Sequence, residues 1–157
     1  AHGRALRRVR SPVGRTLIGS GFAEGWAHYG EELMLEEGFH ADDARFQIGV
    51  ALEALVRVTR LACAIGLHTG ALNVDAATRK FMADALVPEA TARSEARRGT
   101  FDPTYGIYTW GKWLILDVRE QARKEWGSEF SLRRFHDALL ALGSPPLGLM
   151  STAVARG

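Results

Sequence analysis

Several features that mark other protein classes are scarce or missing in this sequence of 157 residues. Cys63 is the only cysteine, so an intrachain disulfide and a cysteine-based zinc cage are excluded, and its apolar surroundings predict a small buried residue. No run approaches the roughly twenty apolar residues of a membrane span, and the basic start lacks the apolar centre of a signal peptide. Alternating β patterns hardly occur. These absences favour a helical protein of the cytoplasm.

The composition is that of an ordinary globular protein. Apolar residues make up 46% and charged residues 24%, and the length fits one domain with a real core. The formal net charge is only +2, but positive charge is concentrated at the start of the chain, in Arg4, Arg7, Arg8, Arg10 and Arg15. The sequence opens at Ala1 without a methionine, which indicates a fragment of a longer protein.

Helical periodicity recurs along the whole chain. It predicts helices over the ranges 3–9, 22–37, 41–67, 74–87, 89–98, 105–126 and 132–142. Neither an internal repeat nor a domain linker is evident. We therefore expect an all-α fold, with a single compact multi-helix domain over 1–157 in which 1–20 form a basic arm and 21–157 the helical core.

The longest predicted helix carries polar residues on one stripe of an otherwise apolar surface. Glu53, Arg57, Arg60, Ala64 and His68 follow one another at steps of four, three, four and four. Charge is costly to bury unless it is paired. Two interpretations stay open: a solvent-facing stripe with a Glu53–Arg57 pair, or the lining of an internal cleft that ends at His68.

The helix predicted over 22–37 has a second polar stripe. Glu24, His28 and Glu31 lie at i, i+4 and i+7, so they share one face. Carboxylate oxygen and neutral imidazole are both zinc ligands, although this spacing alone is a weak signal. Aromatic residues at helical spacing are usually core, but a tyrosine such as Tyr105 or Tyr108 beside a metal could donate a hydrogen bond to an oxyanion.

Several short motifs together resemble one family. The segment 22–31 reads F-A-E-G-W-A-H-Y-G-E and resembles the E-G-W-A-x-Y-x-E signature of the bacterial family called domain of unknown function 885. The segment 60–68 resembles its R-L-x-x-D-x-G-I-H element, Tyr108 and Gly111 its Y-K-x-G, and the segment 135–147 its closing F-H-D-x-x-L-x-x-G-x-x-P-L. The matches follow in order along nearly the whole chain.

The resemblance implies specific roles for residues of this chain, because that family is similar to the gluzincin metallopeptidases. The chain would then be the C-terminal part of a larger helical metallopeptidase-like fold that hydrolyses a peptide-like amide with zinc. Glu24 inherits the third zinc-ligand position, and Glu31 that of an acid which orients a ligand. The substrate-side roles fall to His68 and Tyr108, which would hold the carbonyl or its oxyanion, with Arg60 and Tyr105 in substrate binding. His28 and His2 are further possible zinc ligands.

One departure from the family limits these expectations. The family's H-E-x-x-P-G-H motif should precede Glu24, yet no His-Glu pair occurs in the sequence. The zinc-ligand set is therefore incomplete, and this chain alone is expected to be inactive.

Other functions stay open as well. The chain could be a non-catalytic helical scaffold or interaction protein, or a nucleic-acid binder through its basic arm. A bundle-type carboxylate metal site would need a second Glu-x-x-His pair, and the sequence has no second one. We expect neither a nucleic-acid nor a membrane partner. We also expect an apolar face through which the chain self-associates.

Overall fold

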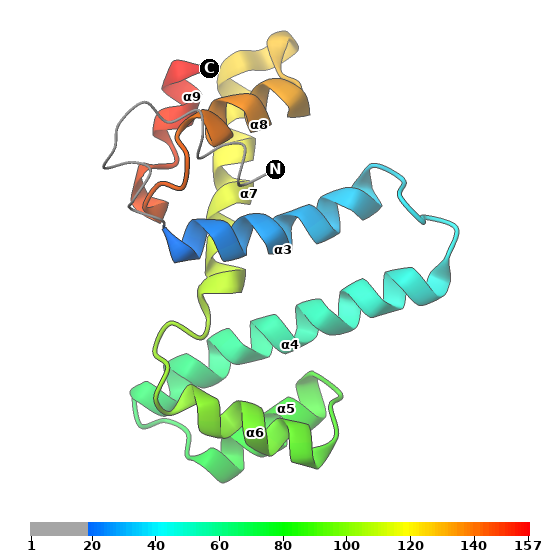
Figure 1. Ribbon diagram of the computed structural model, residues 1–157, viewed down its shortest axis with the longest axis vertical. Helices are drawn as coiled ribbons and strands as arrows, with labels where there is room; N and C mark the ends of the chain where they lie inside the picture. The colour runs from blue at the N-terminus through cyan, green and yellow to red at the C-terminus, as the bar shows by residue number, and fades with distance from the viewer. Residues whose placement is uncertain (1–18) are drawn as a thin grey trace. The chain divides into compact units, whose positions relative to one another are not determined.

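A computed structural model of the protein describes residues 19–157 (Figure 1). The predicted helix over 3–9, the basic arm and His2 lie outside the described residues. Within 19–157 the chain is helical and has no strand, which confirms the all-α prediction. The α-helices of this part are α3 (Ser20–Glu36), α4 (Ala44–His68), α5 (Val74–Asp84), α6 (Glu89–Gly99), α7 (Ile107–Trp126), α8 (Leu132–Ala141) and α9 (Thr152–Arg156), with short 3-10 helices at Gly127–Glu129 and Leu147–Leu149.

Local sequence signals set the helix ends. The side chains of Asp43, Asn73 and Ser131 cap α4, α5 and α8 by accepting hydrogen bonds from main-chain N–H groups in the first turn. Gly38 follows α3 at a φ of +87°, a left-handed conformation that glycine adopts without a steric cost. Helix α5 ends at Asp84 rather than at the predicted residue 87. The chain leaves the helix there, since Leu86 has a φ of +56°, which is left-handed rather than helical backbone.

The chain divides into two compact units, and α3 and α7 each contribute to both. Unit 1 combines Ala1–Tyr29, of which residues 19–29 are described, with Gly111–Gly157, and unit 2 is Gly30–Trp110. The predicted single domain stays a prediction, and each unit is described by itself below.

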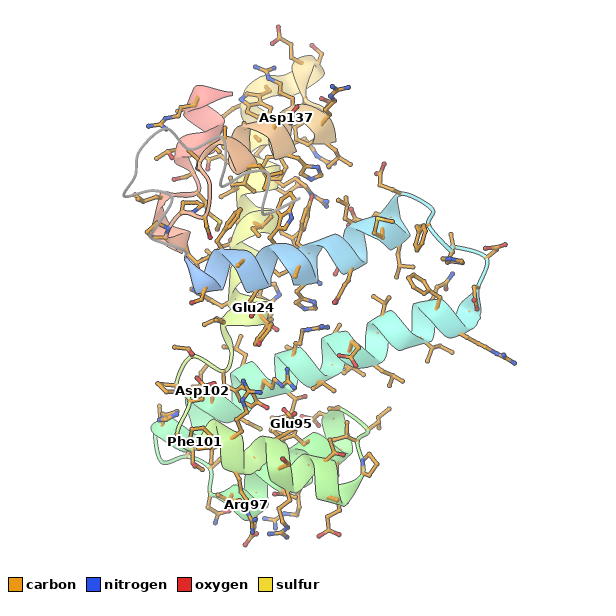
Figure 2. All side chains as sticks on the ribbon, in the orientation of Figure 1. Glu24, Glu95, Arg97, Phe101, Asp102 and Asp137 are labelled. Carbon is orange, nitrogen blue, oxygen red and sulfur yellow. The ribbon has the colours of Figure 1, made fainter. Side chains whose placement is uncertain are left out.

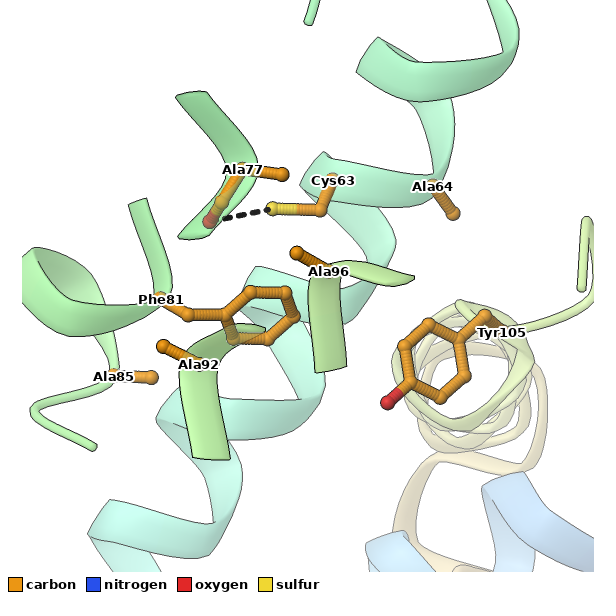
Figure 3. Packing of buried hydrophobic residues seen from close by; sticks show 8 residues of the cluster. All are labelled: Cys63, Ala64, Ala77, Phe81, Ala85, Ala92, Ala96 and Tyr105. Carbon is orange, nitrogen blue, oxygen red and sulfur yellow. Dashed lines mark hydrogen bonds between the residues drawn. The ribbon is translucent and has the colours of Figure 1, made fainter. Parts of the chain in front are cut away.

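Unit 2 is built on close packing of small residues. Helices α5 and α6 pack against each other and against α4 (Figure 1). Most buried residues of this core are alanines, and the larger ones are Phe81 and Tyr105 (Figure 3). Cys63 is fully buried, with its Sγ 4.0 Å from the carbonyl oxygen of Ala77, and burial raises the pKa of this thiol to about 11. The interpretation of Cys63 as a small buried residue is confirmed.

Unit 1 instead fills its core with large side chains. Those with less than 2% exposure are Phe22, Tyr29, Ile115, Phe135, Leu139 and Met150. Its helices α3 and α7 touch backbone to backbone, because a methyl group on Gly25 would lie only 2.5 Å from the carbonyl carbon of Gly111. An alanine at either position would force the two helices apart.

No helix between residues 19 and 157 combines the length and the apolar character that crossing a membrane requires.

Candidate functional site

The polar stripe of α4 is directed mainly into the protein. The guanidinium of Arg57 donates two hydrogen bonds to the carboxylate of Glu31 on α3, at 2.9 and 3.0 Å. The Arg57 side chain is only 17% exposed, whereas Glu53, 3.7 Å from the same guanidinium, is 68% exposed. The two-pronged geometry fixes the orientation of Glu31 as well as pairing its charge. The solvent-facing interpretation of the stripe therefore fits Glu53 but not Arg57.

One turn further along α4, Arg60 is the centre of a polar and aromatic cluster. Its guanidinium donates to both carboxylate oxygens of Glu95 on α6, at 2.7 and 2.8 Å, and Figure 2 shows Glu95 on the side of α6 that faces α4. The Tyr105 hydroxyl donates to the same carboxylate. The guanidinium carbon of Arg60 also lies 5.0 Å from the ring centre of Tyr105 and 5.9 Å from that of Tyr108. This cluster joins α4 to α6 and to the segment that enters α7.

Burial and pairing act together on the protonation of this cluster. Burial by itself would raise the pKa of Glu95, but hydrogen bonds from Arg60 and Tyr105 and the nearby positive charges lower it overall. The hydrogen bond to Glu95 raises the pKa of Arg60 further. Burial, followed by the hydrogen bond to Glu95, raises the pKa of Tyr105. At neutral pH the cluster is therefore a carboxylate, a guanidinium and a neutral phenol.

At its C-terminal end α4 forms one wall of a pocket of about 380 Å³. The opposite wall comes from the start of α7 and the loop before it. Its lining includes Leu61, Ile65, His68, Pro103, Ile107 and Trp110. Most of the lining is apolar, but His68 brings a ring that can donate or accept a hydrogen bond and Thr69 brings a hydroxyl.

The E-G-W-A segment of α3 contributes mainly to the core of unit 1. The Tyr29 hydroxyl and Nε2 of His136 are hydrogen-bonded at 2.9 Å, and the Trp26 and His136 rings meet edge-on at 5.3 Å between centres. His28 is buried, with 4% exposure, while Glu24 is partly exposed. Two motifs far apart in the sequence, E-G-W-A-x-Y and F-H-D, thus meet in one unit.

Five of the predicted site residues lie on or against α4 in unit 2, in three separate places along the helix. Glu31 binds Arg57, Arg60 contacts Tyr105 and Tyr108, and His68 lines the adjoining pocket. Glu24 and His28 belong to unit 1. Over residues 19–157 no three His, Cys, Asp or Glu side chains come together as a metal site. The assigned catalytic, substrate and ligand roles stay predictions.

Sequence reasoning missed the partners that organise this region. Glu95 lies in a short polar helix, 35 positions from Arg60, and nothing in the local pattern distinguishes it from its charged neighbours. Arg57 was noticed only as a possible partner of Glu53, one turn away on the same helix. The better partner, Glu31, is 26 positions away and meets it only in the folded chain.

The fold and its motifs define an all-helical domain of one bacterial class. The family model described as "Bacterial protein of unknown function (DUF885)" matches residues 4–154, and the chain belongs to this family. No functionally curated protein matches the chain.

Two solved structures share this fold at moderate sequence identity. One is described as "the putative lipoprotein from Colwellia psychrerythraea", with 30% identity and a TM-score of 0.82 over 87% of this chain. The other is described as "a putative lipoprotein of unknown function from Shewanella oneidensis", with 25% identity and a TM-score of 0.89 over 99% of this chain. The matched regions make up 23% and 29% of those chains, so this chain spans less than a third of either structure.

Proposed function

We propose that the chain is the C-terminal helical part of a zinc-dependent, peptidase-like hydrolase. The main support is that Glu31, Arg60, Tyr108 and His68, which the family motifs single out, all lie on or against α4, where Tyr105 also contacts Arg60. Polar groups gathered beside an apolar pocket are typical of substrate sites.

The residues of unit 2 suggest a division of labour. Tyr108 and His68 have side chains at least partly exposed, and we assign them to binding the carbonyl of a peptide-like substrate. Arg60 and Tyr105 already share the Glu95 carboxylate, so their contribution to substrate binding would be to hold the Tyr108 segment in place. Glu31, fixed by Arg57, would orient a zinc ligand.

The described residues fit the zinc ion only in part. Glu24 offers one carboxylate on α3, but residues 19–157 contain no cluster of three ligands. The remaining ligands and the general base would come from outside these residues. We therefore derive no catalytic step for this chain, and we expect it to bind zinc weakly and to be inactive alone.

The test uses the longer Shewanella oneidensis relative, because this chain corresponds to only part of it. Placing glutamine at the position that superposes on Glu24 should remove both bound zinc and hydrolysis of a mixed peptide library. The matching change at the position of Glu53, which is 68% exposed here, should leave both intact. Absence of zinc and of hydrolysis in the unmodified relative would overturn the proposal.

A non-catalytic scaffold is the second candidate. It is favoured by the same Arg60–Glu95–Tyr105 network, because side chains that hydrogen-bond to one another stabilise the packing of their helices. A relative that lacks zinc and hydrolysis but captures a partner through the α4 region would support this alternative.

A further inference from the structure

The size and the lining of the pocket at the end of α4 indicate the kind of group that it binds. Its volume of about 380 Å³ lies at the low end of the range of roughly 300–1,000 Å³ that is usual for ligand sites. That space suits one large side chain with its adjoining main chain. An entire helix does not fit in it.

The walls of the pocket are apolar on both sides. Leu61 and Ile65 come from α4, and Pro103, Ile107 and Trp110 come from the opposite wall. Among residues 19–157 no carboxylate, ammonium or guanidinium group lines it, so a charged side chain would lose its hydration there without gaining a partner from this part of the chain. An aliphatic or aromatic group would instead gain free energy by leaving water.

The polar groups at the pocket differ in their availability. The Thr69 hydroxyl donates to the carbonyl oxygen of Ile65 at 2.8 Å, so it is used within the helix. His68 is exposed, and among residues 19–157 its imidazole has neither a hydrogen bond nor an ion pair. It can therefore donate to a carbonyl oxygen of a bound molecule.

We infer that this pocket binds a large apolar side chain of a peptide-like substrate, with His68 donating a hydrogen bond to the adjacent main-chain carbonyl. The peptide nature of the ligand rests on the proposed function, whereas the preference for an apolar side chain rests on the pocket itself. The inference adds a substrate preference for leucine-like or phenylalanine-like residues.

The experiment titrates the zinc-free 157-residue chain with capped amino acids and follows backbone amide shifts by NMR. N-acetyl-leucine and N-acetyl-phenylalanine N-methylamides should give saturable shifts within 61–69 and 103–110. The glycine analogue should bind at least about tenfold more weakly, because it has no side chain to bury. The aspartate analogue should also bind at least about tenfold more weakly.

Two protein variants with matched exposure separate the pocket from general surface effects. Ile65→Glu changes a pocket wall that is 57% exposed, and it should weaken binding of the leucine derivative at least about tenfold. Ile48→Glu makes the same change at a 58% exposed position of α4 that does not line the pocket, and it should leave binding unchanged. His68→Ala should weaken binding by about two- to tenfold, the loss of one hydrogen bond.

Equal binding of the leucine and glycine derivatives would overturn the inference. Shifts of 61–69 and 103–110 that follow protein concentration alone would overturn it too, because a second copy of the chain would then occupy the pocket. The titration needs neither zinc nor hydrolysis. Its failure is therefore distinguishable from failure of the proposed function, which the Glu24 substitution tests in the longer relative.

Discussion

Helix α4 partly buries charged side chains and exposes apolar ones, although it also supplies Cys63 and Ala64 to the core of unit 2. Arg57 and Arg60, with side chains 17% and 19% exposed, face other helices of the same unit. Apolar residues outside the polar stripe are more exposed, with 37–58% of their surface accessible: Ile48, Leu52, Leu55 and Val58. A surface helix normally turns its charges to water and its apolar stripe to the core.

The difference shows what stabilises each face. The inner charges are tolerated because each has a carboxylate partner with two hydrogen bonds, Glu31 for Arg57 and Glu95 for Arg60. The apolar residues of the outer face stay largely uncovered by the rest of unit 2. A contiguous exposed apolar surface is typical of a docking face. The inner face should therefore govern folding, and the outer face should govern association.

The largest effect is expected from removing the acid of the inner face. Glu95→Ala leaves the Arg60 guanidinium and the Tyr105 hydroxyl without their shared acceptor in a mostly buried position. The free energy of unfolding should fall by about 3 kcal/mol, as is usual when one partner of a buried ion pair is lost. Urea denaturation followed by circular dichroism measures the change.

The control for this change is on the same helix as Arg60. Glu53→Ala removes an acid that is 68% exposed and 3.7 Å from Arg57, and exposed ion pairs contribute only about 0–1 kcal/mol. If Glu95→Ala and Glu53→Ala lowered the free energy of unfolding by similar amounts, burial would not distinguish the two acids. The stabilising role assigned to the inner face would then be wrong.

The inner face should also make stability depend on acid. Because the folded pKa of Glu95 lies below its ordinary value of 4.5, its contribution is fully present above that pH and is lost as the pH falls through the folded pKa. The difference in unfolding free energy between the wild type and Glu95→Gln should therefore shrink between pH 5 and pH 3. A difference that stays constant over this range would contradict the assignment.

Local signals of the sequence predict the helices of the described region well, because caps, glycine stops and periodicity act over a few residues. The predicted ranges 74–87 and 132–142 begin at the residues where α5 and α8 begin, directly after the caps Asn73 and Ser131. The direction of the α4 stripe could not be predicted, since periodicity shows that Arg57 and Arg60 share a face but not what that face meets. Their partners Glu31 and Glu95 are 26 and 35 positions away.

For the candidate site, the motif resemblance singled out His68 and Tyr108. Only the folded structure shows the pocket that His68 lines.

A smaller effect is expected at the start of α4, on neither face. The Asp43 side chain accepts hydrogen bonds from the main-chain N–H groups of Arg45 and Phe46. Asp43→Ala should lower the free energy of unfolding by about 1 kcal/mol, the usual value of an N-cap. Asp43→Asn, which retains an acceptor oxygen, should recover most of that loss in the same urea titration.

The smallest effect on stability, and the clearest on association, is expected at the outer face. Ile48 is 58% exposed, so Ile48→Glu should change the free energy of unfolding by no more than about 0.5 kcal/mol. Sedimentation velocity should show that the wild-type chain self-associates as its concentration rises and that Ile48→Glu reduces this association, because a carboxylate would have to lose its hydration in the contact. Met82→Glu, at a 41% exposed position of α5, should leave the association unchanged. A wild-type chain that stays monomeric at every concentration would contradict the assigned role of the outer face. The exposed apolar residues of α4 would then contribute neither to folding nor to self-association.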